Sequence, residues 1–247
     1  MTDDVVSPPE PTELVSWVNR GARSATRAEE GLGIRAVIFD LDGVVRHFPS
    51  CDGIEHEYGL PKGTLTSIPF ESDLIDPTVT GAWSYEKWIT AIGDRLTERY
   101  GPSARSAAQA FAAFPATVDR EVVDVALRLR ANYTTAILTN GTTRLEAEVR
   151  ALGVEADFDY IFNSARIGYA KPDVRIFRFV LDALGCTAPQ CVFIDDSEAK
   201  LAGAVTLGMQ TVHFTGIDPL KAQLRTFGVQ WSSGRAQPRQ SRFGRAD

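Results

Sequence analysis

Short apolar runs and longer amphipathic stretches alternate along the middle of the chain. The apolar runs have the length of β-strands, and they are continuous rather than alternating, which is typical of strands buried on both faces of a parallel sheet. Five strands are predicted in this way, at Ile34–Phe39, Thr135–Leu138, Tyr160–Phe162, Cys191–Ile194 and Gln210–Phe214.

Helical patterns lie between these strands. Glu121–Arg130 places its apolar residues on one stripe, and Thr143–Leu152 and Val174–Leu184 each end at a glycine, Gly153 and Gly185, which is a common helix terminator. An alternation of strand and helix is the signature of right-handed βαβ units. The pattern therefore predicts an α/β fold with a doubly wound, parallel-sheet (Rossmann-like) core.

One region, residues 48–115, interrupts this rhythm because it has no comparable strand signal. Ser84 is a good N-cap for a helix that runs to Tyr100, and Ala104–Phe114 is a second, alanine-rich helical stretch. We therefore expect a helical cap domain inserted directly after the first strand.

The remaining residues divide into a core and two terminal segments. The core is predicted to comprise residues 34–47 and 116–228, and residues 1–33 form an N-terminal extension in which Leu14–Asn19 has the pattern of a short helix. Residues 229–247 are predicted to be a flexible basic tail, because arginines there alternate with serine, glycine and proline.

Composition and charge exclude several classes of protein. The chain has 247 residues and a formal net charge of −6, which argues against nucleic acid as its main partner. No apolar run approaches the ~18–20 residues of a membrane span, and the acidic first thirty residues do not resemble a signal peptide. The three cysteines show no CxxC spacing, so neither a disulfide framework nor a zinc ribbon is indicated, and a cytoplasmic protein is expected.

Polar side chains follow the predicted strands. In an open parallel sheet, ligands bind beyond the carboxyl ends of the strands, so residues at these positions should meet at one edge. The set consists of four carboxylates, a hydroxyl, an amide and an amine, namely Asp40, Asp42, Thr139, Asn140, Lys171, Asp195 and Asp196.

This set of residues favours a hard divalent cation. Crowded ionised carboxylates repel one another and need a compensating cation, and ligands that are all oxygen favour Mg²⁺, whereas zinc is disfavoured without histidine or cysteine. A carboxylate beside Mg²⁺ can attack a phosphoryl group and form an aspartyl-phosphate. Lys171, the Thr139 hydroxyl and the backbone N–H groups of residues 41–43 and Asn140 can supply the positive charge and donors that a transferring phosphoryl group requires.

Four segments also resemble, in order and spacing, the motifs of the haloacid dehalogenase-like (HAD) hydrolases. The resemblance covers about residues 34–214 and rests on these segments: Phe39–Val44 (FDLDGV), Ile137–Asn140 (ILTN), Lys171–Pro172 (KP) and Phe193–Ser197 (FIDDS).

The resemblance implies a role for each residue. Asp40 would be the nucleophile that is phosphorylated, and Asp42 the general acid and then the general base. Thr139, Asn140 and Lys171 would bind the phosphate, with Lys171 also screening its charge from Asp40. Mg²⁺ would be held by Asp40, by the backbone carbonyl of Asp42, and by the fourth-motif acids Asp196 and Asp195.

The resemblance further implies a phosphatase that acts on a small phosphorylated metabolite, because a helical cap in this position is found in the subclass with such substrates. The second aspartate, Asp42, favours phosphoryl chemistry over dehalogenation, since a carbon–halogen bond needs no proton for its leaving group. Two alternatives stay open: a sugar phosphomutase of the same superfamily, and a domain of this shape that binds a ligand or partner without turnover.

Two features of the motifs leave a choice of interpretation. Arg46 and His47, just past the first motif, either contact substrate or form a solvated hinge to the cap. Lys200 stands where several relatives have Asn or Asp, and it either points away or alters the surroundings of the metal.

Overall fold

The structure, a computed structural model, describes residues 33–231 of the chain. A five-stranded parallel sheet in the order β5-β4-β1-β6-β7 forms its centre. The strands are β1 (Ala36–Phe39), β4 (Thr134–Thr139), β5 (Tyr160–Asn163), β6 (Cys191–Asp195) and β7 (Gln210–His213). This arrangement confirms the predicted doubly wound α/β core, although β1 begins two residues later than predicted.

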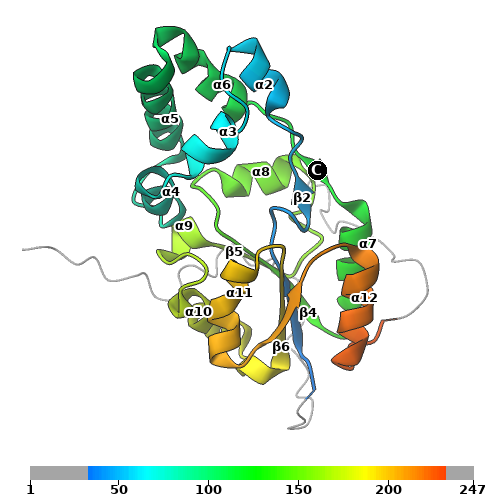
Figure 1. Cartoon of the computed structure of the whole chain (residues 1–247). Helices are drawn as coiled ribbons and strands as arrows, with labels where there is room; N and C mark the ends of the chain where they lie inside the picture. The colour runs from blue at the N-terminus through cyan, green and yellow to red at the C-terminus, as the bar shows by residue number, and fades with distance from the viewer. Residues whose placement is uncertain (1–32, 232–247) are drawn as a thin grey trace, which may run out of the picture.

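Helices cover both faces of the sheet (Figure 1). Side chains alternate along β1, so Val37 and Phe39 pack with α7, α8 and α12, whereas Ala36 and Ile38 pack with α10 and α11. The core helices are α7 (Arg120–Leu129), α8 (Leu145–Ala151), α9 (Ser164–Ile167), α10 (Val174–Leu184), α11 (Glu198–Leu207) and α12 (Ile217–Thr226), with a 3₁₀ turn η4 (Ala188–Gln190). The central strands are buried on both sides, which explains their continuous apolar sequences.

Residues 48–116 form a helical cap beyond the carboxyl ends of the strands. The predicted helix that begins after Ser84 is confirmed as α5, and the alanine-rich stretch becomes a 3₁₀ turn followed by α6. The cap also contains shorter helices that the sequence pattern did not predict. Its elements are α2 (Asp52–Glu57), α3 (Thr64–Ser67), η2 (Ile68–Phe70), α4 (Ser72–Val79), α5 (Tyr85–Tyr100), η3 (Pro102–Ser106) and α6 (Ala107–Ala112).

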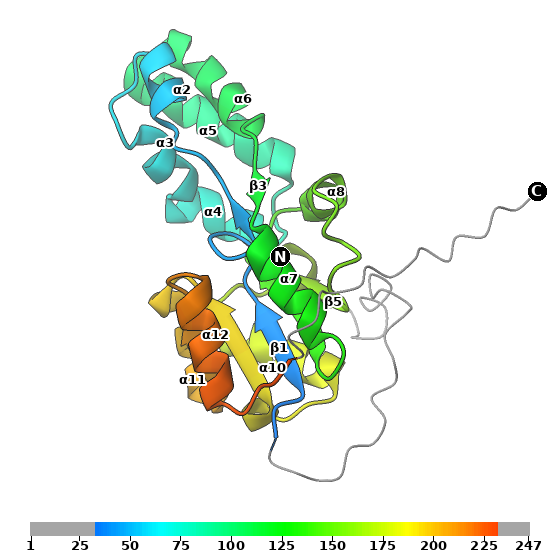
Figure 2. The same cartoon turned by 90° about the vertical axis from the view of Figure 1, so that its right-hand side faces the viewer.

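Two short antiparallel strands, β2 (Arg46–His47) and β3 (Thr117–Val118), connect cap and core (Figure 2). Each has only two residues, which is too short to leave a periodic pattern in the sequence. Cap and core also touch directly at Gly81, where an added Cβ would lie 2.0 Å from the carbonyl oxygen of Ala165. The cap is therefore joined to the core by a two-stranded hinge and a close backbone contact.

The predicted boundary at residue 229 is wrong, because the last described residues belong to the core. Val229 is fully buried, and Trp231 packs against the cluster on the α7 side of the sheet. The rest of the predicted tail and residues 1–32 of the N-terminal extension, with its predicted helix at Leu14–Asn19, lie outside the described residues. Among residues 33–231, no helix has both the length and the apolar character to cross a membrane.

Candidate active site

Parallel strands bring the residues of the first and fourth motifs together. Phe39 of β1 lies opposite Ile194 of β6, and the backbone N–H of Asp40 donates to the Ile194 carbonyl at 2.8 Å. Asp40 and Asp195 therefore emerge side by side at the carboxyl edge of the sheet. Thr139 ends the neighbouring strand β4 and is also buried. This edge of the sheet faces the cap (Figures 1 and 2).

Asp40 is a buried carboxylate with a cation on each side. Its Oδ1 accepts from the backbone N–H of Leu41 at 2.7 Å and lies 2.8 Å from Lys171 Nζ, and its Oδ2 lies 3.4 Å from Lys200 Nζ. Burial alone would raise the pKa of Asp40, but the charges of Lys171 and Lys200 hold this pKa below its ordinary value. Asp40 is therefore kept as an anion, which is the form that a nucleophile needs.

Lys171 is the fixed cation of the site. Its buried ammonium group contacts Asp40, donates to Asp195 Oδ2 at 2.7 Å and donates to the Leu138 carbonyl at 3.0 Å. The side chain of Asn140 bonds to the Lys171 backbone on both sides: Nδ2 donates to the carbonyl at 2.9 Å, and Oδ1 accepts from the N–H at 2.8 Å. The Asn140 side chain thus positions Lys171, a role that the sequence analysis did not assign to it.

Three carboxylates gather at one point. One oxygen each of Asp40, Asp195 and Asp196 lies within 4.8 Å of the other two. Asp196 approaches the loop after β1 closely, and a Cβ on Gly43, whose φ is +86°, would lie only 2.1 Å from its Oδ2. Burial, together with the charge of Asp40, raises the pKa of Asp195 to about 6 although Lys171 opposes the shift.

The cluster suits the metal ion that the sequence predicts. All three side chains offer oxygen, the donor that Mg²⁺ prefers, and the required glycine at position 43 leaves Asp196 free to face Asp40. Asp40, Asp195 and Asp196 would hold the ion. The carboxylate of Asp42 is outside this cluster of side chains, and the part predicted for Asp42 in metal binding is that of its backbone carbonyl.

The Asp42 carboxylate is bound by Arg46. Nε of Arg46 donates to Oδ1 at 2.6 Å, Nη2 donates to Oδ2 at 3.0 Å, and Nη1 donates to Glu148 of α8 at 2.7 Å. Arg46 is buried in the hinge strand β2, whereas its neighbour His47 is partly exposed and lies 3.5 Å from Asp119. Both residues are therefore part of the hinge, and Arg46 also positions a residue of the first motif.

Further contacts of Glu148 and Arg144 link the Arg46 ion pair to the cap. Glu148 accepts from Arg144 Nε at 3.0 Å, and the Arg144 guanidinium lies 3.9 Å from the ring centre of Tyr85 on α5. Nη2 of Arg144 also donates to the Ala112 carbonyl at the end of α6, at 3.3 Å. Sequence analysis missed Glu148 and Arg144. Their i,i+4 spacing on a helix was visible, but nothing in the sequence indicated what they would meet.

Comparison with known proteins identifies the family. A sequence model described as "haloacid dehalogenase-like hydrolase" matches residues 34–208, which include all four motifs and the whole cap. The chain belongs to the haloacid dehalogenase-like hydrolases. This result confirms the resemblance on which the predicted roles were based.

The individual relatives of the chain are named for different enzymatic activities. The chain is 29% identical over 205 residues to "Bifunctional epoxide hydrolase 2" of Mus musculus, covering 73% of this chain but only 36% of that relative. It is 29% identical over 110 residues to "(S)-2-haloacid dehalogenase 4A" of Burkholderia cepacia, covering 41% and 48% of the two chains. The chain thus spans about a third of the length of the first relative and just under half of the second.

A solved HAD structure shares the fold. The enzyme bt-2542 of Bacteroides thetaiotaomicron, in complex with magnesium and inorganic phosphate, superimposes with a TM-score of 0.58 at 24% identity, covering 73% of this chain and 93% of that one. The similarity supports the arrangement of core and cap described above.

Proposed function

We propose that this HAD-like hydrolase is a Mg²⁺-dependent phosphatase that hydrolyses a small phosphorylated metabolite through an aspartyl-phosphate on Asp40. The observation that carries the proposal is the environment of Asp40: a buried, ionised carboxylate beside a fixed ammonium group and two further carboxylates. The proposed compartment is the cytoplasm, which is compatible with three cysteines that are all free thiols.

In the first step, a carboxylate oxygen of Asp40 attacks phosphorus and the bond from phosphorus to the ester oxygen breaks. The leaving alkoxide takes a proton from the carboxyl group of Asp42, whose position Arg46 sets. Lys171 stabilises the equatorial oxygens by its charge, and Thr139 is proposed to bind one of them.

In the second step, Asp42 accepts a proton from water as the water oxygen attacks phosphorus. The bond between phosphorus and the Asp40 oxygen breaks, so Asp40 returns as a carboxylate and inorganic phosphate leaves. The proton taken from water returns Asp42 to the acid form that it had before the first step, so no further proton is needed for the next turnover. When bound at Asp40, Asp195 and Asp196, Mg²⁺ supplies charge neutralisation for the phosphoryl oxygens.

Two observations favour phosphoryl transfer over dehalogenation, the activity in the name of one relative. The three-carboxylate cluster calls for a cation, for which the displacement of a halide has no use, and Asp42 provides a proton source that a departing halide does not need. The magnesium and phosphate bound by the solved relative from B. thetaiotaomicron add support. A sugar phosphomutase would use the same residues and differs in keeping the phosphoryl group.

The test is a panel of small phosphate esters assayed for phosphate release by the full chain with Mg²⁺ and with EDTA. We expect at least one ester to be hydrolysed only with Mg²⁺, and Asp40→Asn to reduce its turnover by at least about a thousandfold. Conversion of one sugar phosphate into its isomer without free phosphate would favour the mutase. Release of halide from 2-haloacids without metal would contradict the proposal.

A further inference from the structure

Two lysines flank Asp40, and they differ in how firmly they are held. Lys171 Nζ has three acceptors and no exposure, so its position is fixed. Among residues 33–231, Lys200 Nζ has one hydrogen-bond acceptor, Asp40 Oδ2 at 3.4 Å, and its side chain is 33% exposed. Lys200 lies in the first turn of α11, and its Nζ approaches the carboxylate cluster through Asp40.

The ammonium group of Lys200 interacts electrostatically with all three carboxylates of the cluster. Although burial works against its charged form, Asp40, Asp195 and Asp196 together raise the pKa of Lys200 above its ordinary value. Three carboxylates and the fixed ammonium of Lys171 leave two negative charges, which is the charge that a divalent cation balances. Lys200 already neutralises one of these two charges.

We propose that Lys200 is an internal competitor of the divalent cation: its ammonium group neutralises the Asp40–Asp195–Asp196 cluster in the metal-free protein and swings toward solvent when the ion binds. The inference rests on the proposed function in that it takes this cluster as the metal site. Lys200 thereby stabilises the metal-free fold and weakens the affinity for Mg²⁺. The single long contact and the partial exposure of Lys200 are what permit the movement, which Lys171 cannot make.

The experiment measures Mg²⁺ binding to the metal-stripped full chain by calorimetry, and the melting temperature with and without Mg²⁺. In Lys200→Met we expect a Kd for Mg²⁺ lower by about tenfold or more, because an opposing charge a few ångströms away is removed. The melting temperature of the metal-free variant should be several degrees below that of the natural chain. The rise in melting temperature on adding Mg²⁺ should be larger for the variant than for the natural chain.

Matched variants isolate the local effect. Lys62→Met removes the same charge from an exposed site in the cap, where Lys62 pairs with Asp52, and it should leave the Kd for Mg²⁺ unchanged. Lys200→Arg keeps the charge, so its Kd for Mg²⁺ should stay within a few-fold of that of the natural chain. Lys200→Gln should lower the Kd for Mg²⁺ as Lys200→Met does. It provides a second neutral variant if one of the two folds poorly.

A Kd in the neutral Lys200 variants that equals or exceeds that of the natural chain would overturn the proposal, since Lys200 would then point away from the ion or support its binding. If neither the natural chain nor these variants bind Mg²⁺, the metal site itself is wrong and this inference fails with it. If the neutral variants bind Mg²⁺ more tightly but no ester is hydrolysed, the proposed function fails and the role of Lys200 stands.

Discussion

The cap and the core each contain a deeply buried carboxylate, and the two carboxylates are bound by different kinds of donor. Glu55 of the cap and Asp40 of the core are 2% and 1% exposed. The Glu55 oxygens accept from the backbone N–H groups of Gly63 at 2.8 Å and Leu65 at 2.7 Å. Asp40 accepts from one backbone N–H and otherwise faces the ammonium groups of Lys171 and Lys200.

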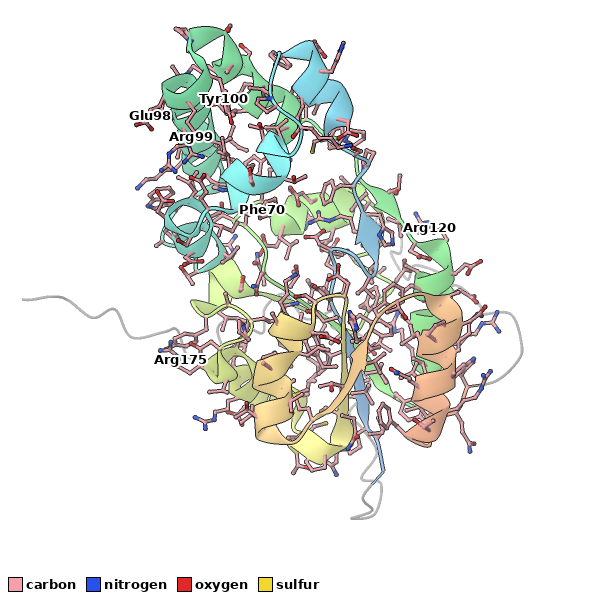
Figure 3. All side chains as sticks on the ribbon, viewed as in Figure 1. Phe70, Glu98, Arg99, Tyr100, Arg120 and Arg175 are labelled. Carbon is pink, nitrogen blue, oxygen red and sulfur yellow. The ribbon has the colours of Figure 1, made fainter. Side chains whose placement is uncertain are left out.

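The difference shows how burial serves structure in one region and chemistry in the other. Backbone donors cannot leave without unfolding the loop, so Glu55 fixes the turn between α2 and α3. The ammonium group of Lys200, which has one long contact, can move aside for an incoming cation. Most other charges of the cap lie on its outside, as Glu98 and Arg99 on α5 do (Figure 3).

The largest expected effect is that of Lys171→Met in the core. The substitution leaves Asp40 and Asp195 without their shared counter-charge, and breaking a buried ion pair in this way costs about 3–5 kcal/mol. We expect that loss in the free energy of unfolding measured with urea, together with loss of phosphate release. Lys62→Met on the cap surface should leave the free energy of unfolding nearly unchanged, because water screens the exposed pair that Lys62 forms with Asp52.

A smaller effect is expected for Glu55→Gln in the cap. The new amide group retains one acceptor for two backbone donors, so one buried N–H loses its partner at a cost of about 1–3 kcal/mol. Glu57→Gln, on the exposed side of the same helix, is the control. If Glu55→Gln instead abolishes phosphate release at unchanged stability, the contrast between the two carboxylates is wrong.

Arg46→Met, in the hinge between the two regions, should have the smallest effect. Without its two hydrogen bonds Asp42 loses its orientation, and we expect kcat to fall about tenfold with little change in KM. Arg46→Lys should recover part of the loss. Arg128→Met removes an i,i+4 ion pair on α7 and should leave kcat unchanged. A change confined to stability would reduce Arg46 to a structural role.

The core was largely predictable from sequence, and the cap and hinge were not. Strands such as β1 and β6 are buried on both faces, so their apolar runs are plain, and the acids Asp40 and Asp195 directly follow or end them. The shorter cap helices α2 and α3 and the two-residue strand β2 are too brief to produce a period.

The candidate site was predictable in its residue types but not in its pairings. Nothing in a single sequence shows that the Asn140 side chain holds the Lys171 backbone, or that Arg46 joins Asp42 to Glu148, because these contacts depend on how α8 and the hinge pack in space. Lys200 was visible as a departure from the family pattern. Its approach to Asp40 required the structure.

The most direct test of the central claim is to trap the phosphorylated residue. A hydrolysed ester, mixed with the Mg²⁺-loaded enzyme and quenched in acid during the first turnover, should leave a peptide that contains Asp40 and is heavier by one phosphoryl group. Asp40→Asn should give no such peptide. Full-rate phosphate release by the natural chain with no modified peptide, together with an active Asp40→Asn enzyme, would contradict the account.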